Sequence, residues 1–353
     1  MPSATSDSIP RLKRLLPRMK GKRIGVLGDV MLDRYLWGTA NRLSPEAAVP
    51  VVDFAEQNEC PGGAGNVAVN IAALGGRVQM FGVTGEDEPG RALRASVRGV
   101  SVDGSGILAE KSRVTTVKTR VIARHQQIVR IDRERRDPLR PETEEKLLRL
   151  LFSALKRLDA LVLSDYDKGL ITDSFADRVL SACHQLKVPV FVKPKTSRLY
   201  AYRGARAIVC NAKEAGFFVT RSLADEKSLE DAGRQLLAHF GCGAVLITRG
   251  EKGMSLFEES APRHITIPAT SFEVTYARVG QSGVDRGSAG RQVFDVTGAG
   301  DTVLAVLALA AAAGAPLLDA AVLANIAAGV VVGKLGTASV SPRELAAAFG
   351  EIR

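Results

Sequence analysis

The sequence predicts an α/β protein: a three-layer sandwich with a mostly parallel central sheet and, beside it, a small β-sheet lid. Three observations lead to this prediction. Short continuous runs of Val, Ile and Leu alternate with amphipathic segments of helical period, which is typical of a parallel sheet covered on both faces. Two stretches break that rhythm with strand-like alternation. Near the end of the chain, a glycine-rich turn precedes a long apolar helix.

The β–α alternation can be followed along most of the chain. The first apolar run, 23–28, predicts a buried strand, and the segment 64–74 predicts a helix that ends at Gly75 and Gly76. Further strands are expected at 78–83, 160–164, 188–192, 207–210 and 244–248, and further helices at 175–186, 229–240 and 303–313. The strand runs are short and bounded by polar or turn residues, which separates them from helices.

The lid is predicted from residues 34–60 and 113–134, where polar and apolar residues alternate without helical period. Such alternation is typical of strands with one exposed face. We expect both segments to form one separate sheet, inserted into a main domain at 22–350 that follows a basic N-terminal extension at 1–21. A small sheet placed over a cleft could close it and exclude water.

Size and composition narrow the class of protein. With 353 residues, 46% of them hydrophobic, the chain can bury one large core. No apolar run reaches the roughly 18 residues that a membrane span needs, and the N-terminal stretch 9–22 lacks the apolar core of a secretory signal. That stretch could touch an acidic membrane, but packing on its own domain is favoured. The four cysteines form no CxxC pair, so a cytoplasmic protein with free thiols is expected.

The net charge of +10 comes from two segments. Residues 1–23 hold seven Lys or Arg against one Asp, and residues 111–140 hold ten against three acids. The second segment lacks the interleaved aromatic residues of a stacking platform, and no zinc-finger or RNP pattern occurs. A small phosphorylated substrate therefore explains the charge better than a nucleic acid, and neither a nucleic acid nor a membrane is expected as a partner.

The octapeptide 295–302, D-V-T-G-A-G-D-T, lies directly before the predicted helix 303–313. Gly298 and Gly300 allow a tight turn with exposed N–H groups, and a helix N-terminus favours an anion. Asp301 at that place could take a proton from a hydroxyl while the amides hold a phosphoryl group. The loop and the acid together predict phosphoryl transfer, although an ordinary turn with a dipole-favoured Asp is the structural alternative.

Two earlier motifs fit an acceptor site. Asp33 follows the first strand, and ligands of open α/β sheets bind at the carboxyl ends of strands. Gly62 and Gly63 would let a sugar approach the backbone, and Asn66 offers both a donor and an acceptor. Each motif taken alone could equally be a surface loop or a common turn before a helix.

Together, the octapeptide 295–302 and the diglycine 62–63 resemble the signatures of the ribokinase-like (PfkB) family of sugar kinases. The resemblance implies a ribokinase-like fold, ATP and a sugar as substrates, and Mg²⁺ as cofactor. It also implies that Asp301 is the catalytic base and that Gly298, Ala299 and Gly300 surround the transferring phosphoryl group.

Further segments resemble the nucleotide and metal sites of that family. Asn211 and Glu214 match an N-x-x-E motif that helps to hold Mg²⁺, although a helix cap is an equal alternative. The first acid of the octapeptide often belongs to a monovalent-cation site, which implies K⁺ at Asp295. The implied nucleotide-binding residues are Asn211, Thr248, Gly250, Gly253, Asn325 and Gly329, and the implied metal ligands are Glu214 and Asp295.

Five segments resemble, within the family, the D-glycero-β-D-manno-heptose 7-phosphate kinases: 31–35, 44–52, 124–132, 163–169 and 329–337. This resemblance implies phosphorylation of the anomeric hydroxyl to give heptose 1,7-bisphosphate for ADP-heptose and lipopolysaccharide synthesis, and a homodimer formed through the lid. A phosphorylated substrate needs cations, for which Arg124, Arg130, Lys168 and Lys195 are candidates. The implied substrate-binding residues are Asp33, Gly62, Gly63, Asn66, Arg124, Gln126, Arg130 and Lys195.

The chain departs from the family pattern in three places. It reads Lys193-Pro194-Lys195 where the family usually has Asp-Pro-Lys, and Val209-Cys210-Asn211 where Thr-Pro-Asn is usual, and the loop 274–291 is longer than expected. No HxGH pattern of a fused nucleotidyltransferase occurs, so a kinase domain alone is expected. Two alternatives stay open: a ribokinase-like kinase of another sugar or a nucleoside, and a non-catalytic regulator that binds a sugar phosphate.

Overall fold

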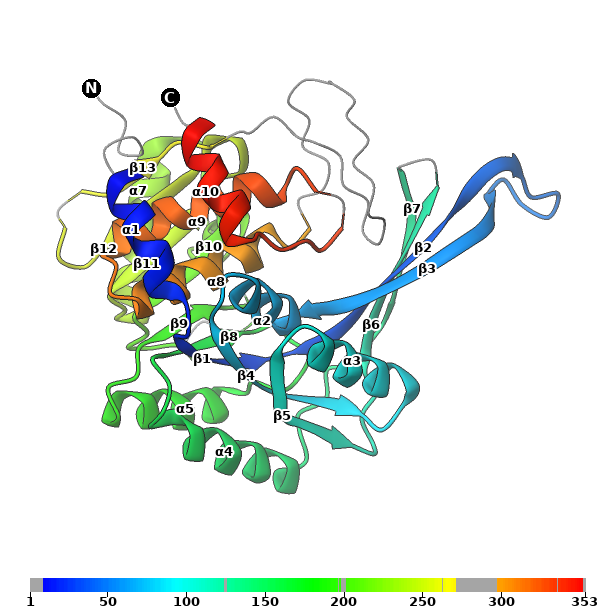
Figure 1. Ribbon diagram of the computed structural model, residues 1–353, viewed down its shortest axis with the longest axis horizontal. Helices are drawn as coiled ribbons and strands as arrows, with labels where there is room; N and C mark the ends of the chain where they lie inside the picture. The colour runs from blue at the N-terminus through cyan, green and yellow to red at the C-terminus, as the bar shows by residue number, and fades with distance from the viewer. Residues whose placement is uncertain are drawn as a thin grey trace.

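The computed structural model describes residues 9–123, 126–195, 197, 201–261, 263–270, 297–334 and 336–351. Within them, a nine-stranded sheet carries the body of the molecule, and a four-stranded sheet projects from it (Figure 1). In spatial order the large sheet consists of β13 (Ile265–Ile267), β12 (Met254–Glu258), β11 (Ala244–Thr248), β10 (Ala207–Asn211), β9 (Val190–Lys193), β8 (Ala160–Ser164), β1 (Arg23–Gly28), β4 (Arg77–Gly85) and β5 (Val102–Glu110).

The large sheet is mostly parallel, as predicted. All neighbouring pairs from β11 to β5 run parallel, and β12 and β13 add an antiparallel edge. The predicted strands at 23–28, 160–164 and 244–248 coincide with β1, β8 and β11. Their side chains are buried on both faces, which explains why they appear in the sequence as continuous apolar runs.

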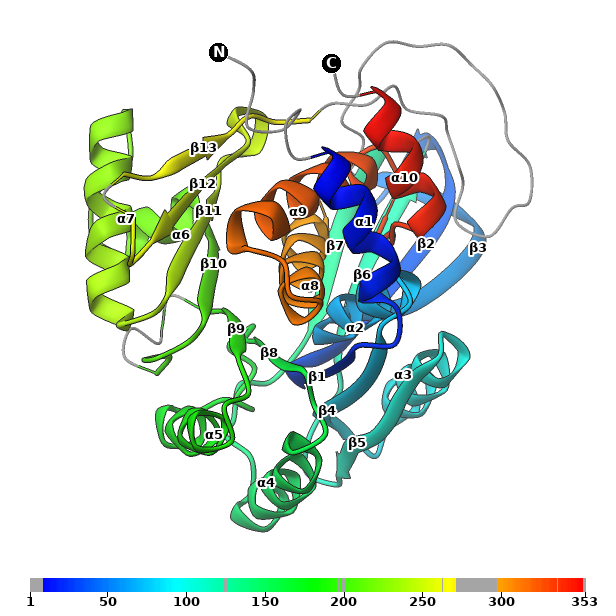
Figure 2. The same ribbon diagram turned by 60° about the vertical axis from the view of Figure 1, so that its left-hand side comes forward.

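Helices cover both faces of this sheet (Figures 1 and 2). One face carries α1 (Ile9–Met19), α2 (Ala64–Ala73), α3 (Glu88–Gly99), α8 (Ala299–Ala312), α9 (Leu317–Val331) and α10 (Pro342–Glu351). The other face carries α4 (Pro141–Leu155), α5 (Asp173–Gln185), α6 (Ala212–Phe218) and α7 (Glu226–Phe240). The apolar side chains of the two faces form two separate buried clusters. Helices α3, α4 and α10 and strands β5, β12 and β13 were not anticipated from the sequence.

The N-terminal helix α1 packs on the body. Leu12, Leu15 and Met19 are buried against helices of the first face, and Arg11 forms an ion pair with Asp319 of α9 at 2.9 Å. Its amphipathic pattern therefore serves packing, as the sequence favoured. Of the helices described, none has the length and apolar character required to traverse a bilayer.

The lid sheet consists of β3 (Pro50–Gly63), β2 (Val30–Leu43), β6 (Thr116–Ala123) and β7 (Gln126–Arg133), in that spatial order. Strand β2 pairs antiparallel with β3 and parallel with β6, and β6 pairs antiparallel with β7. Both segments predicted for the lid thus form one sheet. Strand β2 begins two residues after β1 ends, and β3 continues directly into α2, so the base of the lid is joined to the body at both strands.

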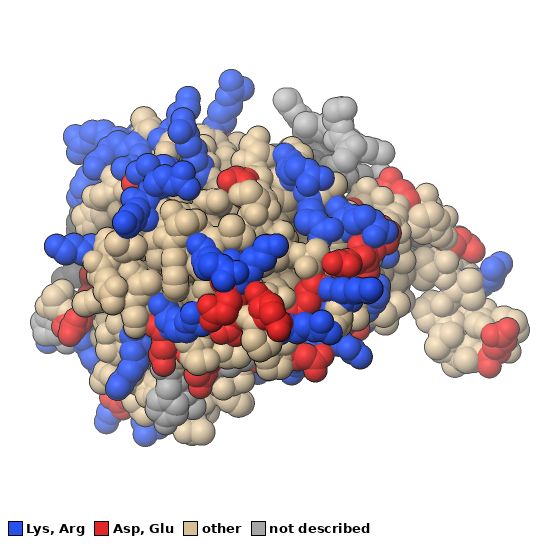
Figure 3. Space-filling model, turned by 90° about the horizontal axis from the view of Figure 1, so that it is seen from below, with Lys and Arg blue, Asp and Glu red and all other residues tan. Residues whose placement is uncertain are grey.

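Charge is mixed on the face that α4 and α5 cover. Seen from below, acidic and basic side chains lie next to one another across its centre (Figure 3). Arg178 of α5, for example, pairs with Glu145 of α4 at 2.5 Å. Positive and negative side chains therefore partly offset one another on this face.

Candidate active site

Polar residues gather where the parallel strands of the body end. Asp29 follows β1, Tyr166 follows β8 after one residue, and Lys193 is the last residue of β9. The strand register places Gly28 beside Ser164 and Ser164 beside Lys193. These side chains therefore share the carboxyl edge of the sheet, where α/β proteins bind their ligands.

Helix α8 begins at this edge with the predicted glycine turn. Gly298 precedes the helix with φ +84°, and a Cβ atom there would lie 2.7 Å from the Asn66 Nδ2 atom, so only glycine fits. The Asp301 N–H donates to the Gly298 carbonyl at 3.0 Å. The N–H groups of Ala299 and Gly300 come before it, at the positively polarised end of the helix.

The carboxylate of Asp301 is held by three side chains and is only 3% exposed. The Tyr166 hydroxyl donates to Oδ1 at 2.5 Å, and the Lys193 ammonium donates to the same oxygen at 2.8 Å. The Asn66 amide donates to Oδ2 at 3.0 Å. A carboxylate has about four lone-pair directions. Three are occupied, and the fourth, on Oδ2, can accept a hydrogen bond from a substrate hydroxyl.

The partners of Asp301 stay in their donor forms. Burial and the negative charge of Asp301 raise the pKa of Tyr166 above its usual range, so the phenol keeps its proton. Burial lowers the pKa of Lys193, but the charge of Asp301 and the contact with Tyr166 outweigh it, and the pKa lies above its ordinary value. The amine is therefore an ammonium ion at neutral pH.

A second carboxylate lies on the lid. Asp33 of β2 is buried and accepts a hydrogen bond from Arg120 of β6 at 2.6 Å. Burial raises its pKa despite Arg120, and Asp301 adds to the rise, so the two carboxylates lie close enough to repel each other. A Cβ atom on Gly62 would lie 2.2 Å from Asp33 Oδ2, which explains why a glycine stands there.

The junction of β3 and α2 links the two carboxylates. Gly62 contacts Asp33, Gly63 precedes the first turn of α2, and Asn66 in that turn donates to Asp301. The structure therefore brings the predicted residues Asp33, Gly62, Gly63, Asn66 and Asp301 together. A sugar placed here could present hydroxyl groups to both carboxylates.

The residues predicted to bind the substrate phosphate lie in different parts of the structure. Lys195 lies near the site, 6.0 Å from the centre of the Tyr166 ring. Arg130 and Gln126 are on β7, which β6 separates from the strand of Asp33, and Arg130 makes two hydrogen bonds to Asp132.

Lys168 is buried with its ammonium 2.8 Å from Glu134. Its charge is therefore neutralised within the chain, which makes it a poor candidate for a substrate phosphate. Arg124 lies outside the described residues.

Asn211 and Glu214 form a capping box at the start of α6. The Asn211 side chain accepts from the Glu214 N–H at 2.8 Å, and Glu214 Oε2 accepts from the Asn211 N–H at 3.0 Å. The helix cap, which was the alternative to a Mg²⁺ site for this motif, is therefore present. Glu214 Oε1 lies 3.9 Å from the Lys195 ammonium, so one oxygen still faces the lysine.

The remaining predicted nucleotide residues lie around β11 and α9. Thr248 ends β11 beside Asn211 in the strand register, and Gly250 and Gly253 close a short 3₁₀ turn after it with positive φ angles. Asn325 of α9 donates to the Pro268 carbonyl at 2.8 Å, and its side chain therefore ties two segments together. Gly329 is one turn further along α9. Asp295 and the loop 274–291 lie outside the described residues.

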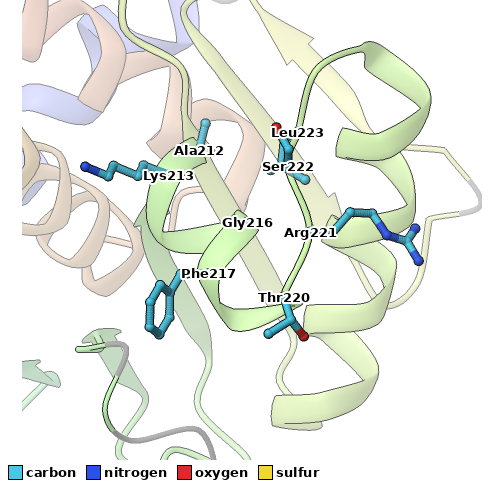
Figure 4. A pocket seen from close by; sticks show the side chains of 8 residues that line it. All are labelled: Ala212, Lys213, Gly216, Phe217, Thr220, Arg221, Ser222 and Leu223. Atoms are coloured by element: carbon cyan, nitrogen blue, oxygen red, sulfur yellow. The ribbon is translucent and has the colours of Figure 1, made fainter.

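A shallow groove lies beside α6. Figure 4 shows its lining, which includes Lys213, Phe217 and Arg221. None of its lining residues belongs to the group around Asp301. The group around Asp301 is therefore separate from this groove.

Three partners of the two carboxylates were not identified from the sequence: Lys193, Tyr166 and Arg120. Lys193 was noted only as a departure from the family pattern. The available signal was its place directly after a buried strand, which puts a side chain at the ligand-binding edge. Arg120 and Tyr166 had no comparable signal, because each contact depends on strand order.

The sequence matches a known protein family and known relatives. The pfkB family carbohydrate kinase profile matches residues 22–344. The chain is 46% identical over 326 residues to the bifunctional protein HldE of Geobacter metallireducens and 45% identical over 325 residues to that of Geobacter sulfurreducens. Each match covers 92% of this chain and 62% of the relative, so the chain spans less than two thirds of the length of these relatives.

Solved structures share the fold. Phosphofructokinase-2 of Escherichia coli, in complex with substrates and products, superimposes with a TM-score of 0.73 at 17% identity. Arabidopsis thaliana ribokinase, complexed with ribose and ATP, superimposes with a TM-score of 0.69 at 18% identity. Both comparisons cover 94% of this chain and 99% of the other, which confirms the predicted ribokinase-like architecture.

Proposed function

This chain belongs to the pfkB family of carbohydrate kinases and is an ATP-dependent sugar kinase, and we propose that its substrate is D-glycero-D-manno-heptose 7-phosphate. The phosphoryl group would pass to the anomeric hydroxyl and give heptose 1,7-bisphosphate for ADP-heptose and lipopolysaccharide synthesis. The proposal is supported by the resemblance of the five segments to heptose 7-phosphate kinases and by the identity to the HldE proteins.

The observation that carries the chemistry is the position of Asp301. Its carboxylate lies in the first turn of α8, and Oδ2 can accept one more hydrogen bond beside that from Asn66. Asn66 links it to the turn that contacts Asp33. In the proposed reaction, Oδ2 takes the proton of the acceptor hydroxyl. The oxygen forms a bond to the γ-phosphorus, and the bond from that phosphorus to the bridging oxygen of ATP breaks, leaving its electron pair on ADP.

The start of α8 would receive the transferring group. The N–H groups of Ala299 and Gly300 stand at the positive end of the helix, where phosphoryl oxygens are stabilised. Asp33, Gly62, Gly63 and Asn66 are proposed to orient the sugar. The lid, which carries Asp33, would exclude water and so limit the hydrolysis of ATP.

Mg²⁺ is proposed to arrive with the nucleotide. Among the residues that the structure describes, no group of three or more His, Cys, Asp or Glu could form a metal cage. A nucleotide-bound ion fits this finding, since Mg²⁺ takes most ligands from phosphates and water and only one or two from carboxylates. Glu214 is the carboxylate proposed to contact it. When bound, the ion neutralises charge on the phosphate oxygens. Asp295, proposed for K⁺, lies outside the described residues.

The lid also supports a proposed homodimer. It exposes several large apolar side chains, with Phe54 65% and Ile131 57% exposed; the others are Leu43, Val49 and Val129. Exposed apolar side chains on a projecting sheet (Figure 1) are suited to a partner surface. Light scattering after gel filtration should give twice the mass of one chain, and the double variant Phe54→Asp and Ile131→Asp should give a monomer. A monomeric wild type would refute the dimer.

A cytoplasmic location belongs to the same proposal. It is supported by the need for ATP and by Cys60, Cys183, Cys210 and Cys242, which are free thiols, a state typical of a reducing compartment. Cell fractionation with antibody detection would test it, and recovery in a secreted or periplasmic fraction would contradict it.

The substrate is tested by ADP release with a panel of sugars. Heptose 7-phosphate should give the highest kcat/KM, and heptose without the phosphate should be about 10- to 100-fold poorer, since charge-assisted contacts to the phosphate are lost. Phosphorus NMR of the product would show whether the new phosphate is on the anomeric carbon. A higher kcat/KM with fructose 6-phosphate, ribose or a nucleoside would replace the substrate, and binding without turnover would favour a regulator.

A further inference from the structure

Lys193 lies at the meeting point of the proposed base and the glycine turn. Its ammonium is 2.8 Å from Asp301 Oδ1 and 3.2 Å from the Tyr166 hydroxyl, and it stands 5.0 Å from the centre of the Tyr166 ring. A Cβ atom on Gly300 would lie only 3.3 Å from the same nitrogen. The charge is therefore next to the start of α8, where the transferring phosphoryl group is expected.

The ammonium has one donor to spare. A lysine side chain offers three N–H donors, and two of those of Lys193 go to Asp301 and Tyr166. Its side chain is 19% exposed, so the group is confined but not sealed. The ring of Tyr166 supports the ammonium from one side. A phosphoryl oxygen at the glycine turn could accept the third hydrogen bond without any rearrangement of the strand.

The charges change in the course of the reaction. Before transfer, the ammonium is neutralised by the Asp301 carboxylate. When that carboxylate takes the proton of the acceptor hydroxyl, it becomes neutral and Lys193 loses its anionic partner. At that stage the acceptor oxygen bonds to phosphorus close to Asp301, and the phosphoryl oxygens carry the negative charge. An interaction that strengthens at this stage stabilises the transition state more than the ground state.

We propose that Lys193 is a catalytic residue, whose ammonium passes from the Asp301 carboxylate to an oxygen of the phosphoryl group as that carboxylate is protonated. The proposal rests on the kinase function and on phosphoryl transfer at the start of α8, but not on the identity of the sugar. This role differs from that of a lysine that only holds Asp301 in place. If Lys193 acted only through Asp301, substituting it would not change the affinity for a transition-state mimic once the Asp301 carboxylate is removed.

Steady-state kinetics with the best sugar of the panel gives the first test. Lys193→Met should lower kcat by about 100-fold, as expected for loss of one charge-stabilising donor, while the KM for ATP changes less than about threefold. Lys193→Arg should restore part of the activity. The matched control is Lys146→Met, an exposed lysine on α4, which should leave kcat unchanged. A Lys193→Met enzyme with kcat within threefold of wild type would overturn the proposal.

A binding experiment separates contact with the phosphoryl group from support of the base. It compares two variants, Asp301→Asn and the double variant Asp301→Asn, Lys193→Met, and the double variant also avoids leaving a buried carboxylate without its cation. Calorimetry would measure the affinity for ADP with aluminium fluoride, which mimics the phosphoryl group in flight, and for a non-hydrolysable ATP analogue. The double variant should bind the aluminium fluoride complex at least about tenfold more weakly and the analogue about equally.

Equal affinity of both variants for the aluminium fluoride complex would show that Lys193 acts only through Asp301 and would overturn the assignment. The tests do not depend on the substrate proposal. If wild type turns over another sugar in place of heptose 7-phosphate, the substrate proposal fails while the Lys193 experiments proceed with that sugar.

Discussion

At the candidate active site, the body and the lid each contribute one buried carboxylate with a cationic partner, and the two pairs are built differently. In the body, Asp301 at a helix N-terminus meets Lys193 from the end of a strand. In the lid, Asp33 and Arg120 come from the adjacent strands β2 and β6. Lysine is a compact charge on a flexible stem, whereas the guanidinium of arginine is planar and keeps its charge. In the body pair, Lys193 is therefore suited to change its partner during the reaction. In the lid pair, Arg120 is suited to hold Asp33 in a fixed geometry.

The surroundings of the two pairs point in the same direction. Lys193 has a spare donor beside the glycine turn, whereas Arg120 also stacks over the Tyr35 ring at 5.4 Å. The hydroxyl of Tyr35 in turn bonds to Thr337 at 2.7 Å, which ties the lid to the C-terminal part of the body. The difference suggests a division of labour: the body pair takes part in the transfer of charge, and the lid pair holds the acceptor side in register with it.

The largest effect is expected from breaking the body pair. Asp301→Asn keeps the shape of the side chain but removes the base, so kcat should fall about 10³- to 10⁴-fold, equivalent to about 4 to 5.5 kcal/mol. The melting temperature should also fall, because Lys193 would lose its anionic partner. The measurement is kcat with the best sugar of the panel, corrected for the folded fraction by circular dichroism.

Asp177→Asn is the matched control for this variant, since Asp177 is exposed on α5, and it should leave kcat and the melting temperature unchanged. Near-normal turnover by folded Asp301→Asn would remove the base from the mechanism. It would also remove the distinction between the two pairs, because both would then be structural.

Breaking the lid pair should lower the stability of the fold and not the rate of the chemical step. Arg120→Met leaves Asp33 buried without its cation, so the free energy of unfolding should fall by about 3 to 5 kcal/mol at neutral pH. Urea denaturation would measure it. The double variant Asp33→Asn, Arg120→Met should recover most of the loss, because no unpaired charge remains. Its KM for the sugar should still be raised, since Asp33 is proposed to orient the acceptor.

An Arg120→Met protein with wild-type stability would show that Asp33 is already neutral in the fold. Burial raises the pKa of Asp33, so the neutral acid is the alternative that this measurement checks. Denaturation at pH 5 would separate the two cases. A protonated Asp33 needs no cation, so the loss of stability in Arg120→Met should be smaller at pH 5 than at neutral pH.

The sequence was sufficient to predict the central strands and the glycine turn at the start of α8. Strands such as 160–164 are buried on both faces, and continuous apolar runs of that kind can be read without knowledge of their neighbours. The turn at 298–301 was predicted because glycines before an apolar helix constrain the backbone locally. The structure also places Asp33 and Asn66 near that turn, which the family resemblance implied.

The ion pairs could not be predicted in the same way. Lys193 and Asp301 are 108 residues apart, and Asp33 and Arg120 are 87 apart, so each pair exists only once the strand order is set. In the sequence, a lysine before a proline and an arginine in an alternating strand both resemble surface charges. Lys168 shows the converse: a residue that the sequence offers for phosphate binding is paired with Glu134 in the fold.

A third buried carboxylate shows how the body holds an acid by a different means. Asp29, which follows β1, accepts hydrogen bonds from the backbone N–H groups of Tyr166 and Lys168 at 2.8 and 3.1 Å. Burial, reinforced by the charge of Asp165, raises its pKa to about 6, from an ordinary value of 3.8. The folded protein therefore binds this proton more tightly than the unfolded chain does. The stability that the group contributes is fully present below about pH 4 and is lost as the pH rises through about 6.

Asp29→Asn should remove this pH dependence, because the amide mimics the protonated acid and its oxygen can still accept both backbone hydrogen bonds. Between pH 4 and pH 7, the wild type should lose about 2 to 3 kcal/mol of unfolding free energy relative to the variant. Urea denaturation of both proteins across that range would measure the difference. Parallel curves would mean that Asp29 titrates in the fold as it does in the unfolded chain. The loop that carries Tyr166 to Asp301 would then be insensitive to the ionisation of Asp29. Backbone N–H donors would then stabilise the charged form of a buried carboxylate as well as Lys193 does for Asp301 and Arg120 does for Asp33.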